Sequence, residues 1–216
     1  MKLESDGMLI ALKPINERDV IARVFTRDYG VMVGVMRGAI VAKKNKPMVG
    51  QFGAAVWNAR VDSQLGVFHW EIEKNITALL MNNQRELLQL NAAFELMATL
   101  LPEREEYAKL FADTCELIDG LVRQLPDAYL KWEINLLGEL GYALDLSRCS
   151  GCGTNINLNY LSPKTGRAVC DKCAAPYINR VYKLPLNLDV TGKFLYNVYA
   201  QQGGTVPQAR LMLNFI

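Results

Sequence analysis

Hydrophobic and polar residues alternate in five short segments between Gly7 and Lys74. Alternation with a period of two predicts strands, because successive side chains of a strand point to opposite faces. The segments are residues 8–12, 20–25, 31–36, 51–61 and 67–73, and turn-forming residues such as those at 13–14 and 62–66 separate them. Five short strands in about 70 residues predict a small β-barrel of the OB type, with an SH3-like barrel as the alternative.

After Thr77 the hydrophobic period changes to that of helices. Leu87, Leu90, Phe94, Met97 and Leu101 form a first apolar stripe, which Pro102 ends. A second stripe contains Phe111, Cys115, Ile118, Val122 and Leu125, and it predicts a core position for Cys115. A third helix is predicted to begin at Asp127 and to direct Leu130, Ile134 and Leu137 inward. Further helices are predicted at 189–201 and 207–216. We expect an α+β protein with a barrel domain at 1–78 and a helical domain at 79–216.

Two C-x-x-C pairs interrupt the helical part of the chain. They form the pattern Cys149-x2-Cys152-x17-Cys170-x2-Cys173, and this central spacing lies within the roughly 15–20 residues expected for a four-cysteine zinc site. Residues 160–169 between the pairs read as a hairpin. The pattern predicts a zinc ribbon inserted at 147–176, with one structural Zn²⁺ per chain because four protein ligands leave no open position. A redox dithiol or an iron–sulfur cluster is the alternative.

Composition and charge place the chain among globular proteins. Of its 216 residues, 50% are hydrophobic and 21% are charged, with a net charge of +2. Counts of Lys+Arg against Asp+Glu are 11 against 8 in residues 1–78, 5 against 12 in 79–146 and 8 against 2 in 147–216. The two basic parts suggest an anionic partner. Since no apolar run approaches the roughly 18 residues of a membrane span, we expect a cytoplasmic, nucleoid-associated protein that binds no membrane.

Motifs of catalysis are missing from the sequence, which has no phosphate-binding loop, dinucleotide fingerprint, zinc-protease motif or nucleophile elbow. The single histidine, His69, lies in a predicted strand between Phe68 and Trp70, where a partly exposed structural role is expected. The sequence therefore favours a binding protein over an enzyme, without a small-molecule substrate.

The predicted barrel carries candidate nucleic-acid contacts. Grooves for single strands combine cations for phosphates with aromatic rings for bases. The connection from Gly38 to Gly50 contains three lysines and no acid, and we expect it to be mobile. Phe25 is expected in the core, whereas Tyr29 and Phe52 are further aromatic candidates. The predicted phosphate-binding residues are Arg23, Arg27, Arg37, Lys43, Lys44 and Lys46.

Several motifs together resemble the RecO family of bacterial DNA repair and recombination proteins. The N-terminal part matches through residues 16–19, 25–30 and 36–39 and the lysine-rich loop that follows. The C-terminal part matches through Lys131-Trp132-Glu133-Ile134, residues 140–143, the cysteine pairs and Ser162-Pro163-x-x-Gly166. The resemblance extends over nearly the whole chain.

The resemblance implies an OB-fold domain and a helical domain with an embedded zinc finger. It implies a non-enzymatic mediator that binds single- and double-stranded DNA, anneals complementary strands and helps to load RecA. It also implies RecR and the acidic C-terminal tail of single-stranded DNA-binding protein as partners, and by analogy that tail would bind near Lys131 and Trp132. The competing interpretation is a zinc-ribbon module that contacts RNA or protein in transcription or translation.

Overall fold

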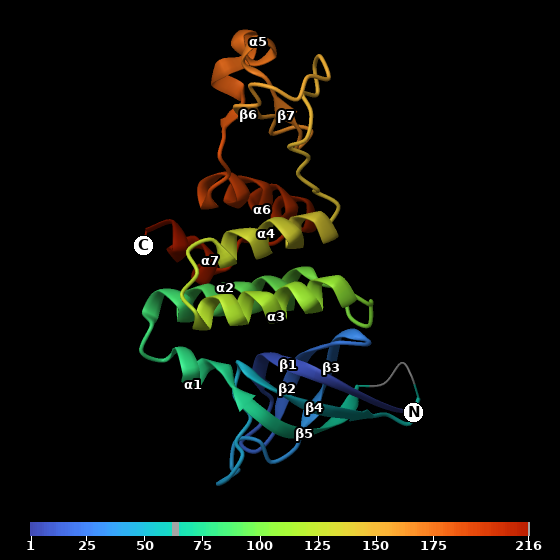
Figure 1. The fold of residues 1–216 in the computed structure, drawn as a ribbon. Coiled ribbons are helices and arrows are strands. Elements are labelled where there is room, and N and C mark those ends of the chain that lie inside the picture. Colours follow the sequence, from blue (N-terminus) through green and yellow to red (C-terminus); the bar gives the residue numbers. More distant parts are fainter. Residues whose placement is uncertain (62–64, 216) are drawn as a thin grey trace. The chain divides into compact units, whose positions relative to one another are not determined.

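The computed structural model describes residues 1–61 and 65–215, so part of the turn predicted at 62–66, and Ile216, lie outside the described residues. The chain divides into two compact units (Figure 1). The first comprises Met1–Ala128 and Pro207–Asn214, and the second comprises Tyr129–Val206 and Phe215. The helices between residues 78 and 128, which we expected in a separate helical domain, therefore belong to the same unit as the strands.

Five strands form the N-terminal part of the first unit (Figure 1). They are β1 (Lys2–Pro14), β2 (Val20–Thr26), β3 (Gly30–Met36), β4 (Gln51–Asn58) and β5 (Gly66–Asn75). They close into a barrel with the order β1-β2-β3-β5-β4. Neighbouring strands are antiparallel except for β3 and β5, which pair in parallel through Gly34 with Gly66 and Val35 with Val67. The mixed α+β class predicted from the sequence is thus confirmed.

The barrel core follows the alternation of the strands. In β4, inward residues from Gln51 to Trp57 are buried at every second position. Trp57 is 1% exposed, and its indole nitrogen donates a hydrogen bond of 2.9 Å to the carbonyl of Val33. Gly66 leaves room for this ring, because a Cβ there would lie 2.1 Å from it. Phe25 is fully buried, as predicted.

Helices α1 (Ile76–Leu80), α2 (Gln84–Leu100), α3 (Ala108–Val122) and α7 (Gln208–Met212) complete the first unit. The short 3-10 turn η2 (Leu213–Phe215) follows α7. The sequence did not predict α1, a short helix whose N-terminus is capped by the Asn75 side chain, which accepts a hydrogen bond from the Ala78 amide. The inward stripe predicted for α2 is confirmed at Leu90, Phe94 and Met97.

The inward face of α3 agrees with the prediction at Phe111 and differs from it further along the helix. Its buried side includes Leu110, Thr114, Leu117 and Leu121, at spacings of 4, 3 and 4, whereas Cys115 is exposed. The helix carries two adjacent apolar stripes, and the stripe through Leu117 is the one that enters the core. Of the predicted stripe, Phe111 is buried as expected and Leu125 is exposed. Cys115, Ile118 and Val122 line a pocket of about 320 Å³, to which the barrel contributes residues such as Met8 and Phe52.

The second unit contains helices α4 (Ala128–Glu139) and α6 (Leu188–Gln202) with the cysteine-bearing lobe between them in sequence. The lobe has strands β6 (Tyr160–Leu161), β7 (Ala168–Val169) and β8 (Tyr182–Lys183), α5 (Asp171–Ala174) and the 3-10 segment η1 (Ala175–Arg180). The predicted hairpin is confirmed as β6–β7. The third strand, β8, was not predicted, and it gives the order β7-β6-β8. In the described part of the chain, no helix has the length and apolarity to cross a bilayer.

Candidate nucleic-acid interface and metal centre

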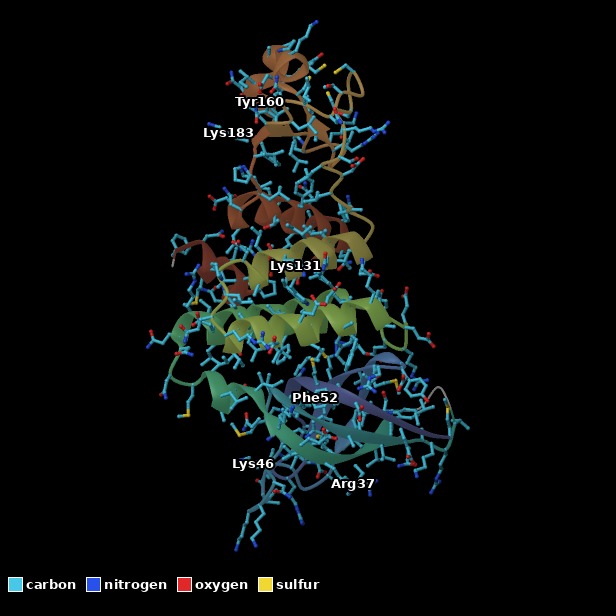
Figure 2. The ribbon with its side chains drawn as sticks, viewed as in Figure 1. Arg37, Lys46, Phe52, Lys131, Tyr160 and Lys183 are labelled. Carbon is cyan, nitrogen blue, oxygen red and sulfur yellow. The ribbon has the colours of Figure 1, made fainter. Side chains whose placement is uncertain are left out.

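The connection between β3 and β4, residues 37–50, is called the basic loop below. Its Arg37, Lys43, Lys44 and Lys46 are exposed, and within residues 1–61 and 65–215 none of the four forms an ion pair. Figure 2 shows Arg37 and Lys46 on the side of the barrel away from α2 and α3. The structure thus places four predicted cations on one loop, where Arg37 interacts electrostatically with Asp19 but none of the four forms an ion pair within the described residues.

The first end of the basic loop is tied to the β1–β2 connection. The carboxylate of Asp19 accepts a hydrogen bond of 2.7 Å from the amide of Gly38, and the carbonyl of Arg18 accepts one of 3.0 Å from Ile40. A hydrogen bond from the Asn16 side chain and the one from Gly38 hold the pKa of Asp19 below its usual range. Asp19 therefore remains ionised and fixed beside the loop at neutral pH.

The second end is tied to the barrel core by Gln51, which is 3% exposed. Its amide nitrogen donates to the carbonyl of Lys46 at 3.0 Å, and its amide oxygen accepts from Met48 at 3.1 Å and from the Trp70 indole at 3.2 Å. The loop that we expected to be mobile is therefore hydrogen-bonded to the barrel at both ends. Sequence reasoning missed Gln51, although a polar residue at an inward strand position was the available signal.

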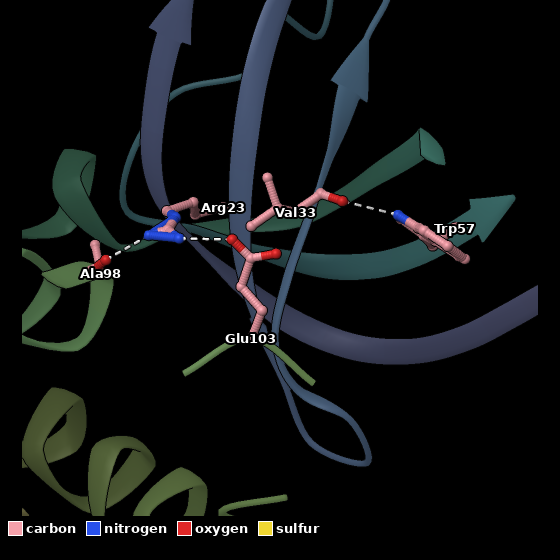
Figure 3. A network of polar contacts seen from close by, with 5 residues as sticks. All are labelled: Arg23, Val33, Trp57, Ala98 and Glu103. Carbon is pink, nitrogen blue, oxygen red and sulfur yellow. Dashed lines mark hydrogen bonds and ion pairs between the residues drawn. The ribbon is translucent and has the colours of Figure 1, made fainter. Parts of the chain in front are cut away.

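Arg23 and Arg27 lie apart from the basic loop. The Arg23 guanidinium donates to the carbonyl of Ala98 at 2.6 Å and to the carboxylate of Glu103 at 2.8 Å (Figure 3). Arg27 forms an ion pair of 2.8 Å with Asp6. Both guanidinium groups thus join parts of the first unit to one another. Of the six predicted phosphate-binding residues, the four on the basic loop are the ones that form no ion pair within the described residues, and Arg37 among them interacts electrostatically with Asp19.

The candidate aromatic residues do not join the loop cations. The Phe25 ring packs against Phe111 with centroids 5.5 Å apart. Tyr29 is half-buried against the barrel core, in the β2–β3 turn at the opposite end of β3 from Arg37. Phe52 is half-buried and lies toward α3 in Figure 2. The basic loop therefore has exposed cations but no stacking platform among these three rings.

The four cysteines of the second unit form one cluster, with all sulfur atoms within 4.8 Å of one another. The sulfurs of Cys152 and Cys170 are 3.7 Å apart. In a tetrahedral shell with metal–sulfur bonds of about 2.3 Å, the sulfur–sulfur edge is about 3.8 Å. Cys149 and Cys170 are buried, and Cys152 is exposed. The residues therefore fit a metal ion with four thiolate ligands.

The hydrogen bonds within the cluster shift the pKa values of two of its thiols in opposite directions. Hydrogen bonds from the backbone amides of Cys170 and Cys152 lower the pKa of the Cys149 thiol to about 6. Hydrogen bonding with Cys152 and Cys170 raises the pKa of the Cys173 thiol to about 12. Four adjacent sulfurs thus ionise together only when a cation offsets their charge.

The first cysteine pair needs glycine at its turn. A Cβ on Gly151 would lie 3.0 Å from the Cys173 sulfur, tighter than ordinary van der Waals contact. Gly153 has a φ of +76°, in the left-handed region that favours glycine. These two requirements explain why glycine occupies both positions in the sequence Cys149-Ser-Gly-Cys152-Gly.

The chain is similar to known proteins over most of its length. The family model described as "Recombination protein O C terminal" matches residues 85–196. The DNA repair protein RecO of Cereibacter sphaeroides is 36% identical over 99% of this chain and 97% of its own length. The protein of the same name from Jannaschia sp. is 36% identical over 96% of this chain and 91% of its own length. The chain belongs to the RecO family.

The position expected to bind a partner peptide in this RecO-family chain is only partly at the surface. Lys131 is exposed on α4 (Figure 2). Trp132 is 1% exposed, and its ring packs 5.8 Å from that of Tyr129. The Trp132 indole is thus a core side chain and offers no docking surface, which corrects that half of the expectation.

Proposed function

We propose that this RecO-family chain is a non-enzymatic mediator of DNA recombination and repair. It binds single- and double-stranded DNA, promotes annealing of complementary strands and helps to load RecA. The observation that carries the proposal is the basic loop, in which four exposed cations that form no ion pair within the described residues stand on a segment anchored at both ends. The name shared by the relatives, DNA repair protein RecO, supports a role in that process.

Annealing by such a surface requires only electrostatics and geometry. Two complementary strands repel each other through their phosphates, and cations that neutralise phosphates remove this barrier. Phosphate contacts position a strand but leave its base edges free to pair. An anchored loop presents its charges with less entropic cost than a disordered one, because its backbone is already ordered. No nucleotide hydrolysis is needed for this step.

The barrel suits single-strand binding as an OB-type domain. The OB fold is a five-stranded barrel, and here the five strands close into a barrel in which β3 pairs with β5. OB-type barrels bind oligonucleotides through their connecting loops and strand faces. The basic loop is the connection with the highest positive charge, and we assign the phosphate contacts to it.

The cysteine cluster is assigned to one structural zinc ion. The sulfurs of Cys152 and Cys170 are 3.7 Å apart, and all four sulfurs lie within 4.8 Å of one another, as a closed shell of four thiolate ligands requires. Zinc bound there would stabilise a lobe whose own apolar core is small, built around Cys149, Val169, Cys170 and Ala174. With four protein ligands the ion has no open coordination position, so its role is structural.

The partners proposed for this chain come from its family. They are RecR and the acidic C-terminal tail of single-stranded DNA-binding protein. For the tail we retain the neighbourhood of Lys131, whose ammonium group suits a carboxylate, and we exclude the buried Trp132 ring.

The decisive experiment is a strand-annealing assay on the full chain, with metal analysis of the same sample. Complementary DNA oligomers and matched RNA oligomers are compared at equal salt concentration. Faster annealing of DNA than the uncatalysed rate, without added nucleotide, is the expected result. No acceleration with DNA, or binding only to RNA, would overturn the proposal in favour of an RNA-interaction module.

A further inference from the structure

The second unit contains a pocket of about 550 Å³ outside the metal centre. Three segments line it: residues 141–143 after α4, the turn 163–166 between β6 and β7, and one face of α6. This volume lies in the range of roughly 300–1,000 Å³ that small-ligand sites have. Neither the metal centre nor the basic loop contributes a residue to it.

Polar groups converge on this pocket from α6 and from the two connections. Asn197 and Gln201 are one helical turn apart on the same face of α6. The Tyr142 hydroxyl donates a hydrogen bond to the side-chain oxygen of Gln201, which fixes both groups. Asn197 and Lys164 are exposed, and within the described residues neither side chain has a hydrogen bond or ion pair. The pocket thus offers an amide and an ammonium group without partners.

The charge and the apolar surface of the pocket narrow the ligand class. No acidic residue lines it, and Lys164 is its one cation, which matches the single negative charge of a phosphodiester. The half-buried Tyr142 and the exposed Ala200 supply apolar surface to the pocket lining, whereas Phe194 is only 3% exposed. Aromatic and apolar surface beside an amide is the chemistry that holds an unstacked base.

We propose that this pocket binds one unstacked nucleotide of a single DNA strand, and the proposal rests on the DNA-binding function above. The base lies against Tyr142 and Ala200, the Asn197 amide hydrogen-bonds its edge, and Lys164 contacts the adjacent phosphate. Since the base must leave its stack to enter, the pocket favours single strands over duplex. The ribbon turn that carries Lys164 belongs to the C-terminal segment with 8 basic and 2 acidic residues.

The test uses nitrogen-labelled full-length protein and the trinucleotide of thymidine as the probe. Binding is followed through the side-chain amide signals of Asn197 and Gln201. Asn197→Leu and Lys164→Ala are expected to weaken trinucleotide binding about threefold to tenfold, the loss of one hydrogen bond or charge contact. The matched control is Gln202→Leu, an exposed amide on the same helix that does not line the pocket.

A second probe separates base recognition from phosphate attraction. A trinucleotide analogue with the same phosphates and no bases is expected to bind at least fivefold more weakly, since stacking of one base is worth about 1–3 kcal/mol. Equal binding of both probes, or equal affinities of Asn197→Leu and Gln202→Leu, would overturn the pocket assignment. If wild-type protein also fails to bind a 20-nucleotide strand, the proposed function itself fails; if it binds that strand normally, only the pocket is wrong.

Discussion

Replacing Arg37, Lys43, Lys44 and Lys46 together with alanine removes the charge of the basic loop. All four side chains are exposed, and within the described residues none pairs with an acid, so the substitution breaks no ion pair there. The anchors at Asp19 and Gln51 use the backbone of the loop and stay in place. We therefore expect a folded protein with a selective defect in DNA binding.

The magnitude follows from counterion release. Each single-strand phosphate contact contributes about −0.7 to the slope of log K against log salt concentration, so four contacts contribute roughly −3. Between 50 and 200 mM salt, this group alone changes the affinity by about 50-fold. The quadruple variant is expected to flatten the slope by about 3, to weaken binding to all sequences similarly and to slow annealing.

The measurement is a fluorescence titration of single-stranded oligomers at several salt concentrations. A matched variant that also removes four positive charges, at Lys2, Lys13, Arg85 and Arg123, controls for net charge and should retain most of the slope. Wild-type affinity and slope in the loop variant would refute the assignment. The DNA site would then belong to the basic C-terminal segment, with Arg148, Lys164, Arg167, Lys172 and Arg180.

Three further predictions test the metal centre, the helical core and the partner surface. Cys170→Ser should lower the metal content well below one ion per chain by elemental analysis, whereas Cys115→Ala on α3 should leave it unchanged. Leu117→Ala should lower the free energy of unfolding in urea by about 2–5 kcal/mol, because Leu117 is 2% exposed. Val122→Ala, at a position 43% exposed, should change it by less than about 1 kcal/mol. Lys131→Glu should weaken binding of the acidic tail peptide in calorimetry, and unchanged binding would place that site elsewhere.

Local sequence patterns predicted where the strands and helices of this chain lie better than they predicted which residues pack against one another. The period of two located all five strands of the first unit, and the cysteine spacing located the four-cysteine cluster. The same local reasoning placed Cys115 in the core, because two apolar stripes run side by side on α3 and periodicity alone does not say which one faces inward. The choice depends on what packs against the helix, and that is a tertiary property.

Charge counts likewise predicted the basic loop but not the engagement of individual cations. Arg23 and Lys43 are equivalent in a sequence count, yet Arg23 is held by Ala98 and Glu103, which follow about 75 residues later. Gln51 orders the loop from inside the barrel, and its three hydrogen bonds depend on the position of Trp70 and of the loop itself. The partners of Arg23 follow it by 75 and 80 residues, and Trp70 follows Gln51 by 19 residues, so these contacts leave no pattern in the local sequence.

The four-cysteine cluster and the pocket turn at residues 163–166 are joined by a short chain of backbone hydrogen bonds. Ser150, within the first cysteine pair, donates to the carbonyl of Ala168 at 2.8 Å, Ala168 donates to Asp145 at 2.8 Å, and Asp145 donates to Gly166 in the pocket turn at 2.9 Å. Loss of the metal frees the cysteine pair and with it the first of these bonds. We therefore expect the Cys170→Ser variant to bind the trinucleotide as weakly as Asn197→Leu does, while the salt dependence contributed by the basic loop, in the other unit, is unchanged. Trinucleotide binding at wild-type strength in metal-free protein would show that the turn keeps its shape without the ion, and this coupling would be refuted.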